Sequence, residues 1–385
     1  MKLRGNMEDK KKVNVMSKKR VLLLSEGFGS GHTQAAHALS EGLKHINPEI
    51  STKVLELGSF LNPVMAPIII NAYRKTVSKQ PKVVGMMYRS NYRKPTNRIT
   101  KNALYRLFYT QTAKVVAKLN PQVIICTHPV PGMMIGKLKE DGLKTPLLTV
   151  ITDYDAHGSW VNDEVNQYLV SSDVVKDRLI EKGTRRDRIS VTGIPIHPKF
   201  WKSSPKEELR AKFNLKDMPT VLIMGGGWGI LHEDSVLSYM TKWRESTQLI
   251  YCVGSNNDMK EKLDADPLFK HPNIHVIGFT QHINELMEVS DLLVTKPGGM
   301  TCTEGLSKAL PMLFYEPIPG QEEENCEYFI NMGFGEMLSS TDTVDRWFKI
   351  IHDRTKISEV REQLVHTRNT HYDPLHCVKA VLKFL

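Results

Sequence analysis

Residues Val21–His32 read VLLLSEGFGSGH, an apolar run followed by a glycine-rich turn and a histidine. Four consecutive aliphatic residues are typical of a strand that is buried on both faces of a parallel sheet. Beyond the turn, apolar residues recur along one face of a predicted helix, at Ala36, Leu39, Leu43 and Ile46. The segment therefore predicts a strand, a tight turn and a helix, which is the opening unit of a Rossmann-like sheet.

The same unit returns in the second half of the chain. The apolar run Thr220–Met224 (TVLIM) is followed by the glycine turn Gly225–Gly229 (GGGWG). Further strands, separated by helical stretches, are expected at 123–126, 147–151, 168–170, 249–253, 275–277, 292–295 and 312–315. Such alternation gives parallel sheets covered by helices on both faces. We predict an α/β protein with two Rossmann-like domains, in which ligands bind at the carboxyl ends of the strands.

The predicted hinge between the two halves is Thr192–Pro198, whose two prolines favour an extended chain. The expected division is a disordered leader at 1–17, an N-terminal domain at 18–197, a C-terminal domain at 198–370 and a closing helix at 371–385. Asp373 is the predicted N-cap of that helix and Pro374 its first residue. The apolar face of the closing helix could return to the N-terminal domain.

Composition excludes several classes of protein. The chain has 385 residues, of which 41% are hydrophobic and 24% charged, as in folded globular proteins. No apolar run approaches the roughly 18 residues that would span a bilayer, and no apolar core of a secretory signal follows the basic N-terminus. The five cysteines form no CxxC pair, so we expect reduced thiols rather than disulfides or a zinc site.

Positive charge is concentrated in one segment. Residues 57–139 hold 14 Lys or Arg and no Asp or Glu, so the rest of the chain is net acidic although the whole carries +10. Basic side chains near an anionic membrane gain about 1 kcal/mol each. Interleaved apolar residues, which suit insertion into a membrane surface, are Ile68–Ile70, Met86–Tyr88, Leu104 and Leu107–Tyr109. Membrane contact is preferred to nucleic-acid binding, because no nucleic-acid motif accompanies the charge.

Polar motifs follow several of the predicted strands. His32 begins a helix, where the helix dipole keeps the imidazole neutral and able to accept a proton; a packing histidine is an equal alternative. Lys296–Thr301 (KPGGMT) with Glu304 suits a diphosphate and ribose, whereas a lone PGG would be a simple turn. Pro317–Asn325 (PIPGQEEEN) offers Gln and Glu side chains for sugar hydroxyls, and its alternative is an acidic surface loop.

A DxD triplet, Asp153-Tyr154-Asp155, follows another predicted strand. Such triplets can bind a divalent cation that carries a diphosphate, but they are frequent by chance. The glycine turns and helix N-termini could neutralise a diphosphate instead, so we expect no metal. His157 and Trp160 lie just beyond the triplet, which makes Asp153 a candidate on the acceptor side of the cleft.

Six motifs in this order resemble the plant monogalactosyldiacylglycerol synthases and the bacterial processive diacylglycerol glucosyltransferases. The resemblance covers almost the whole chain after about residue 18. Its motifs are GxGH (Gly29–His32), TDYxxHxxW (Thr152–Trp160), GIPIHPKF (Gly193–Phe200), MGGGWG (Met224–Gly229), TKPGGxTxxE (Thr295–Glu304) and PIPGQEEEN (Pro317–Asn325).

The resemblance implies a GT-B fold and inverting transfer without a catalytic metal. By matching motif, His32 would take the proton from the acceptor hydroxyl, and Asp153 would assist or orient it. Phe279 would wall the uracil pocket and Glu304 would bind ribose. The other donor-binding residues would be Gly31, Gly226, Gly227, Lys296, Gly298, Gly299 and Thr301, with Gln321 and Glu322 on the hexose. The acceptor and membrane side would include His157, Trp160, Arg89, Arg93, Lys94 and Arg106.

The implied partners are UDP-glucose or UDP-galactose, with glucose favoured, and diacylglycerol, which would be modified at its 3-hydroxyl. Anionic lipids would hold the protein peripherally on the cytoplasmic face of the cell membrane, and no cofactor or nucleic acid is expected. Two features depart from the family's pattern. Glu26 and Phe28 replace part of a richer glycine turn, and Asp155 is acidic where no acid is expected.

Other functions share parts of this pattern. The N-acetylglucosaminyltransferase that builds the lipid-linked peptidoglycan precursor has a related fold, but the basic segment and the PGQEEEN loop fit the glycerolipid group better. A UDP-sugar 2-epimerase would have no use for a membrane patch. A non-catalytic lipid-surface protein that senses a nucleotide sugar is the alternative from another class.

Overall fold

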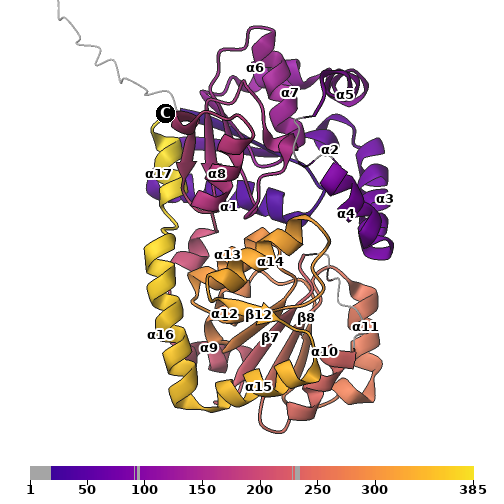
Figure 1. Ribbon diagram of the computed structural model, residues 1–385, viewed down its shortest axis with the longest axis vertical. Helices are drawn as coiled ribbons and strands as arrows, with labels where there is room; N and C mark the ends of the chain where they lie inside the picture. Colours follow the sequence, from indigo (N-terminus) through magenta and orange to yellow (C-terminus); the bar gives the residue numbers. More distant parts are fainter. Residues whose placement is uncertain (1–18, 91, 93–95, 228, 230–234) are drawn as a thin grey trace, which may run out of the picture.

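The computed structural model describes residues 19–90, 92, 96–227, 229 and 235–385. The predicted leader at 1–17 and the predicted membrane residues Arg93 and Lys94 lie outside this range. Within it the chain forms two α/β halves, one above the other in Figure 1, and the C-terminal helices run along one side of both.

Each half contains a six-stranded parallel sheet. The strand orders are β2-β1-β3-β4-β5-β6 and β12-β11-β10-β7-β8-β9. The strands are β1 (Lys19–Ser25), β2 (Ile50–Glu56), β3 (Val123–Cys126), β4 (Leu147–Val150), β5 (Gln167–Val170), β6 (Ile189–Val191), β7 (Thr220–Met224), β8 (Gln248–Cys252), β9 (Ile274–Ile277), β10 (Leu292–Thr295), β11 (Met312–Phe314) and β12 (Gly335–Met337). The predicted fold class, two Rossmann-like parallel sheets, is confirmed.

Helices connect the strands and cover both sheets (Figure 1). In the first half they are α1 (Ser30–Ile46), α2 (Leu57–Leu61), α3 (Met65–Lys79), α4 (Pro81–Ser90), α5 (Arg98–Leu104), α6 (Thr112–Leu119), α7 (Pro129–Glu140) and α8 (Asp173–Glu181). In the second they are α9 (Lys206–Phe213), α10 (Ser235–Tyr239), α11 (Asn257–Ala265), α12 (Ile283–Val289), α13 (Gly299–Ser307), α14 (Gln321–Asn331), α15 (Thr341–His352), α16 (Arg354–His371) and α17 (His376–Leu382).

Shorter helical turns complete the fold. One π-helix, η1 (Tyr105–Tyr109), follows α5. The 3₁₀ turns are η2 (Gly158–Trp160), η3 (Arg186–Arg188), η4 (Pro198–Trp201), η5 (Met240–Trp243) and η6 (Pro267–Phe269). The basic segment 57–139 forms α2 to α6 with η1 and then continues through β3 into α7.

Three strands were not predicted, and all three are edge strands. β2 carries alternately exposed and buried side chains, whereas β6 and β12 are only three residues long. An edge strand buries less surface than a central one, so its sequence needs no continuous apolar run. The central strands β1, β3, β4, β7, β8, β10 and β11 are fully or almost fully buried, and these were predicted.

The closing segment crosses from the second half to the first. α16 runs beside the second sheet and α17 packs against α1 (Figure 1). Val378 and Val381 join the same buried apolar cluster as Leu39. The predicted cap of this helix is wrong, since α17 begins at His376 and the Asp373 carboxylate accepts the N–H of Leu375, in the turn before the helix, at 2.8 Å.

The two halves also share an apolar core at their interface. Ile194 and Phe200 of the hinge region, and Tyr154 after β4, belong to one buried cluster with Met300 and Phe329 of the second half. The ring of Tyr154 contacts that of Phe329 edge-on, with centroids 4.6 Å apart. The carboxyl ends of the two sheets are therefore held against each other by buried side chains.

Glu26 ties the first glycine turn to the basic segment. Its Oε1 accepts the N–H of Gly58 at 3.0 Å and the hydroxyl of Tyr109 at 2.9 Å. The carboxyl group is almost fully buried, and this burial raises its pKa from 4.5 to about 7. Replacement of part of the usual glycine turn by Glu26 thus creates a link from β1 to α2 and η1.

The raised pKa of Glu26 predicts how Glu26→Gln will behave. Between about pH 4.5 and 7 the folded protein keeps a proton that the unfolded chain releases, so the wild-type free energy of unfolding falls as the pH rises. Glutamine does not titrate, so the free energy of unfolding of the variant should not fall in this way. Relative to the wild type, the variant should therefore be about 1–3 kcal/mol more stable at pH 8 than it is at pH 5. Chemical denaturation at both pH values measures this difference. The exposed Glu49→Gln is the control, and an equal effect of Glu26→Gln at both pH values would contradict the prediction.

Candidate active site between the two sheets

The site is built where loops from the two sheets touch. A Cβ added at Gly299, the first residue of α13, would lie 2.2 Å from the backbone oxygen of Thr152, which follows β4. Similarly, a Cβ at Gly227 after β7 would lie 2.5 Å from the hydroxyl oxygen of Ser30, the first residue of α1. Glycine at position 299 lets two backbones meet, and glycine at position 227 makes room for the side chain of Ser30.

His32 lies in the first turn of α1, at the edge of this contact. Its Nδ1 is 2.6 Å from the Oγ1 of Thr152, and its ring contacts those of His128 and Trp160. Burial lowers the pKa of His32 from 6.5 to about 4. The imidazole is therefore neutral at pH 7, as predicted, although burial rather than the helix dipole is the main cause. A hydrogen bond between the ring and the backbone of Thr127 opposes this lowering of the pKa. In the tautomer that carries its hydrogen on Nδ1, Nε2 is the acceptor.

Asp153 contacts the second domain rather than the ring of His32. Its Oδ1 accepts the Nε2–H of Gln321 at 2.5 Å and that of Asn325 Nδ2 at 3.4 Å. Burial raises the pKa of Asp153 to about 6, against the effect of these two hydrogen bonds. The group that orients His32 is thus the hydroxyl of Thr152, a residue that lies within the TDY motif but was not singled out from the sequence.

Two glycines of the predicted diphosphate loop differ in the space around them. Gly298 has no atom within 4 Å of an added Cβ, whereas Gly299 packs on Thr152. Lys296 is mostly buried near Glu322, and burial lowers its pKa. Gly298 thus leaves space in front of the α13 N-terminus, where backbone N–H groups favour an anion.

Two further residues predicted to bind the donor, Glu304 and Glu322, are acids whose pKa is raised by burial. Burial raises the pKa of Glu304, in α13 beyond Thr301, to about 8. Burial also raises the pKa of Glu322 to about 7, and its carboxylate accepts the N–H of Ile318 at 2.8 Å. The sequence predicts that Glu322 binds the hexose. One oxygen of its carboxylate is already hydrogen-bonded within its own loop.

The two glycine turns border this contact, and Phe279 lies at the end of the edge strand β9. Gly226 has a φ of +69° and open space at its Cβ position, and Gly31 packs on the side chain of Met300 in α13. Phe279 follows β9 and is 68% exposed, so its ring is available to a ligand.

The predicted acceptor and membrane residues separate into two groups. Trp160 is only 5% exposed, belongs to the buried core of the first half and lies with its ring near that of His32, so it does not itself face a membrane. The Nε2–H of His157 donates to the backbone oxygen of Tyr88, 2.9 Å away. Arg106 is exposed on η1, and Arg89 is an exposed partner of Glu323 at 3.1 Å.

Two tyrosines expected to insert into lipid are turned inward. Tyr109 is buried against Glu26, and the hydroxyl of Tyr88 donates to Oδ2 of Asp155 at 2.5 Å. The physical reason is the hydroxyl group, which gains more from a buried carboxylate than from an apolar lipid surface. The aromatic pattern alone could not distinguish the two environments.

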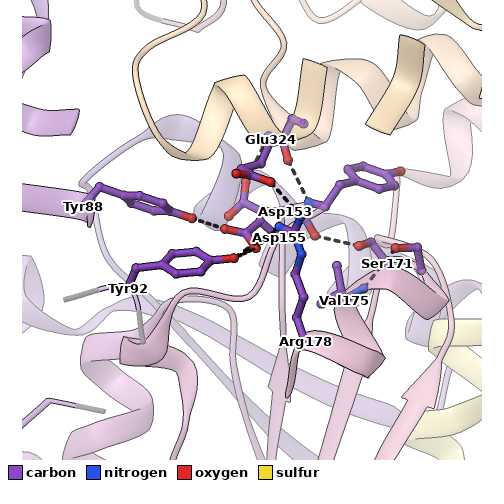
Figure 2. A network of polar contacts seen from close by, with 11 residues as sticks. Tyr88, Tyr92, Asp153, Asp155, Ser171, Val175, Arg178 and Glu324 are labelled. Atoms are coloured by element: carbon purple, nitrogen blue, oxygen red, sulfur yellow. Dashed lines mark hydrogen bonds and ion pairs between the residues drawn. The ribbon is translucent and has the colours of Figure 1, made fainter. Parts of the chain in front are cut away.

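Asp155 is the centre of a polar network that joins four elements (Figure 2). It accepts from Tyr88 and Tyr92 and pairs with Arg178 of α8, while Arg178 also pairs with Glu324 of α14 at 2.8 Å. Asp155, the unexpected acid of the DxD triplet, is thus a structural anion that pairs with the guanidinium of Arg178. Asp153 of the same triplet is instead bonded to Gln321.

An exposed apolar surface lies on the helices of the basic segment. It spans α3, α4, α5 and η1, which project from one side of the first sheet in Figure 1. Met86 is 66% exposed and Leu107 71% exposed. Its other members are Val64, Met65, Ile68, Ile69, Val83 and Ile99. We call this set the apolar face.

In the part of the chain that the structure describes, no helix has both the length and the hydropathy of a membrane span. Among the same residues, no three His, Cys, Asp or Glu side chains are grouped so that they could hold a metal ion.

Comparisons with known proteins agree on a family. Residues 32–196 match the family described as monogalactosyldiacylglycerol (MGDG) synthase, and residues 220–367 match the glycosyltransferase family 28 C-terminal domain. The chain is 32% identical to the processive diacylglycerol beta-glucosyltransferase of Staphylococcus epidermidis over 349 residues, which are 90% of this chain and 87% of that protein.

Solved structures show the same fold. MurG of Acinetobacter baumannii aligns with a TM-score of 0.58 at 14% identity, over 95% of this chain and 99% of its own. HepE of Anabaena, solved in complex with UDP-glucose, aligns with a TM-score of 0.59 at 14% identity, over 95% of this chain and 100% of its own. These likenesses identify the two-domain arrangement as the GT-B fold.

An added methyl group should have a large effect on stability at Gly299 and a small effect at the neighbouring Gly298. Gly299→Ala should lower the free energy of unfolding by about 1–3 kcal/mol, because the added Cβ meets the rigid backbone oxygen of Thr152. Gly298→Ala should change stability much less, because its Cβ enters open space. Chemical denaturation of both variants measures the contrast, and equal destabilisation would show that the domains do not meet at Gly299.

Proposed function

The chain belongs to the family of monogalactosyldiacylglycerol synthases and processive diacylglycerol glucosyltransferases, and from this premise we propose that it transfers glucose from UDP-glucose to the 3-hydroxyl of 1,2-diacylglycerol at a membrane surface. It is a glycosyltransferase of the GT-B fold, and its family makes glycolipids. The observation that carries the proposal is the position of a neutral histidine, His32, where the two domains touch at Thr152 and Gly299.

In the proposed reaction the diacylglycerol oxygen attacks the anomeric carbon of glucose from the face opposite UDP. One C–O bond forms as the bond to the UDP oxygen breaks, so the configuration at that carbon inverts. Nε2 of His32 takes the hydroxyl proton, and the contact of Nδ1 with Thr152 holds the ring. A bound diphosphate would raise the pKa of His32 toward neutrality, because a nearby negative charge favours imidazolium.

The donor diphosphate is proposed to lie before the N-terminus of α13. The open space at Gly298, the backbone N–H groups of the first turn and the Lys296 ammonium together suit two phosphates. These groups supply positive charge without a cation, so we propose that transfer needs no metal. Glu304 then lies one turn further along α13, where it would hydrogen-bond the ribose.

The hexose is proposed to lie between Asp153 and the loop 317–325. The Nε2–H of Gln321 is donated to Asp153, so its Oε1 remains available for a sugar hydroxyl. Glucose and galactose differ at one hydroxyl, and the name of the Staphylococcus epidermidis relative favours glucose.

The apolar face is proposed to contact the membrane. Exposed Lys75, Lys79 and Lys82 flank its apolar side chains on α3 and α4, and Arg106 lies beside Leu107 on η1. Apolar side chains would enter the interface while the cations bind anionic headgroups. We place this contact on the cytoplasmic face of the cell membrane.

His32→Ala should lower kcat by about 10²–10⁴, because a general base contributes a factor of this size. The assay measures glycolipid and UDP formed from UDP-glucose or UDP-galactose and diacylglycerol vesicles, with EDTA present. Binding of UDP should be retained, because His32 is not part of the α13 diphosphate site. His37→Ala, an exposed change on the same helix, is the control. Near wild-type turnover in His32→Ala would refute the assigned base, and UDP release without glycolipid would refute the acceptor.

Ile68→Ser combined with Leu107→Ser should weaken binding to anionic vesicles by about tenfold or more, because two apolar side chains would no longer enter the interface. Vesicle sedimentation measures the partition coefficient. Leu268→Ser, a partly exposed apolar change in the second domain, should leave it unchanged. Equal binding by the double variant and the control would locate the membrane contact elsewhere.

A further inference from the structure

Helix α4 has two different faces. Toward solvent it exposes Val83 and Met86, which belong to the apolar face. On its other side, a Cβ added at Gly85 would lie 2.5 Å from the Cβ of Pro319. A Cβ at Gly320 would likewise lie 2.6 Å from the ring of Tyr88. The loop 317–325, which we call the donor loop, is therefore packed directly on α4.

Polar contacts lock this packing in place through Asp155 (Figure 2). Tyr88 and Tyr92, at the end of α4 and just beyond it, donate to the two oxygens of Asp155 at 2.5 and 2.7 Å. Arg178 pairs with Asp155 through one nitrogen and, through the other, with Glu324 of the donor loop at 2.8 Å. A continuous path thus runs from α4 through Asp155 and Arg178 to the start of α14.

The charges in this path depend on one another. Asp155 is 1% exposed, and burial alone would raise its pKa. The hydrogen bonds from Tyr88 and Tyr92, together with Arg178, outweigh that effect and hold the pKa below its usual range. A buried carboxylate that loses such partners is strongly destabilised. Asp155 is therefore bonded to both tyrosines and to Arg178 at once.

We propose that Asp155 and Arg178 are positioning residues that connect the lipid-facing helix α4 to the donor loop, so that contact of α4 with a membrane stabilises the packing of that loop on α4. The inference rests on the proposed function, in which α4 faces lipid and the donor loop holds the sugar. A lipid surface that restrains α4 reduces the entropy lost when the donor loop packs on that helix, and this couples the two sites without a large movement.

Amide hydrogen exchange of the full-length protein tests the connection without any turnover. In the wild type, anionic phosphatidylglycerol vesicles should slow exchange in peptides covering 321–331 by about threefold or more. In Asp155→Asn, and in Glu324→Gln, the same vesicles should leave that exchange unchanged while still binding. An equal vesicle response in the wild type and both variants would overturn the proposal.

The same measurement separates failure of this inference from failure of the proposed function. When the wild type binds no vesicles, the membrane contact itself is refuted. The connection is then tested in solution by Tyr88→Phe, which removes only the hydroxyl on Asp155. Exchange over 321–331 should become faster by about threefold. Unchanged exchange would refute the connection independently of any lipid.

A double-mutant cycle gives a readout that a purely structural role would not produce. Tyr88 bonds to Asp155 and Glu324 to Arg178, so the two changes affect different ends of the path. Tyr88→Phe and Glu324→Gln should each raise the KM for UDP-glucose about threefold to tenfold, with a smaller change in kcat. The double variant should be no worse than the poorer single variant.

Matched controls are available elsewhere in the second domain. Tyr239→Phe removes another tyrosine hydroxyl bonded to an aspartate, and Glu285→Gln removes another carboxylate paired with a cation. Neither should change the KM for UDP-glucose. Multiplicative effects of Tyr88→Phe and Glu324→Gln on KM would show that the two residues act independently and would overturn the proposal.

Discussion

The close approach of two backbones, Thr152 after β4 and Gly299 at the start of α13, is the constraint on which the site depends. This contact brings the carboxyl end of the first sheet against a helix N-terminus of the second. It leaves no room for a side chain at position 299, and it brings His32, which contacts Thr152, close to Asp153, which contacts Gln321. Burial at this contact then controls the protonation of the groups around it.

Burial has different consequences for the carboxyl groups of the site. Burial raises the pKa values of Asp153, Glu304 and Glu322, and among the described residues no cation bonds directly to them. That of Asp155 is lowered because two hydroxyls and Arg178 surround it. The first three groups can exchange a proton near neutral pH, which suits hydrogen bonding to sugar hydroxyls. Asp155 remains an anion, which suits a structural connection.

The basic segment combines two functions that its composition alone does not separate. Its outward residues, such as Met86 and Leu107, form the apolar face. Its inward tyrosines, Tyr88 and Tyr109, bond to the two acids that depart from the family pattern, Asp155 and Glu26. Both acids are therefore bonded to tyrosines of the basic segment, and they attach its helices to loops of the first sheet.

The sequence by itself determined the features that depend on neighbouring residues. Strand, glycine turn and helix follow one another at Val21–His32 and again after Thr220, because apolar period and glycine conformation are local properties. Six ordered motifs also identified the family, which the comparisons confirmed. Only the tertiary structure showed that Thr152 contacts His32 and that Asp153 contacts Gln321, pairs separated by 120 and 168 residues. The partner of a buried polar group depends on how distant elements pack, and no spacing along the chain records that packing.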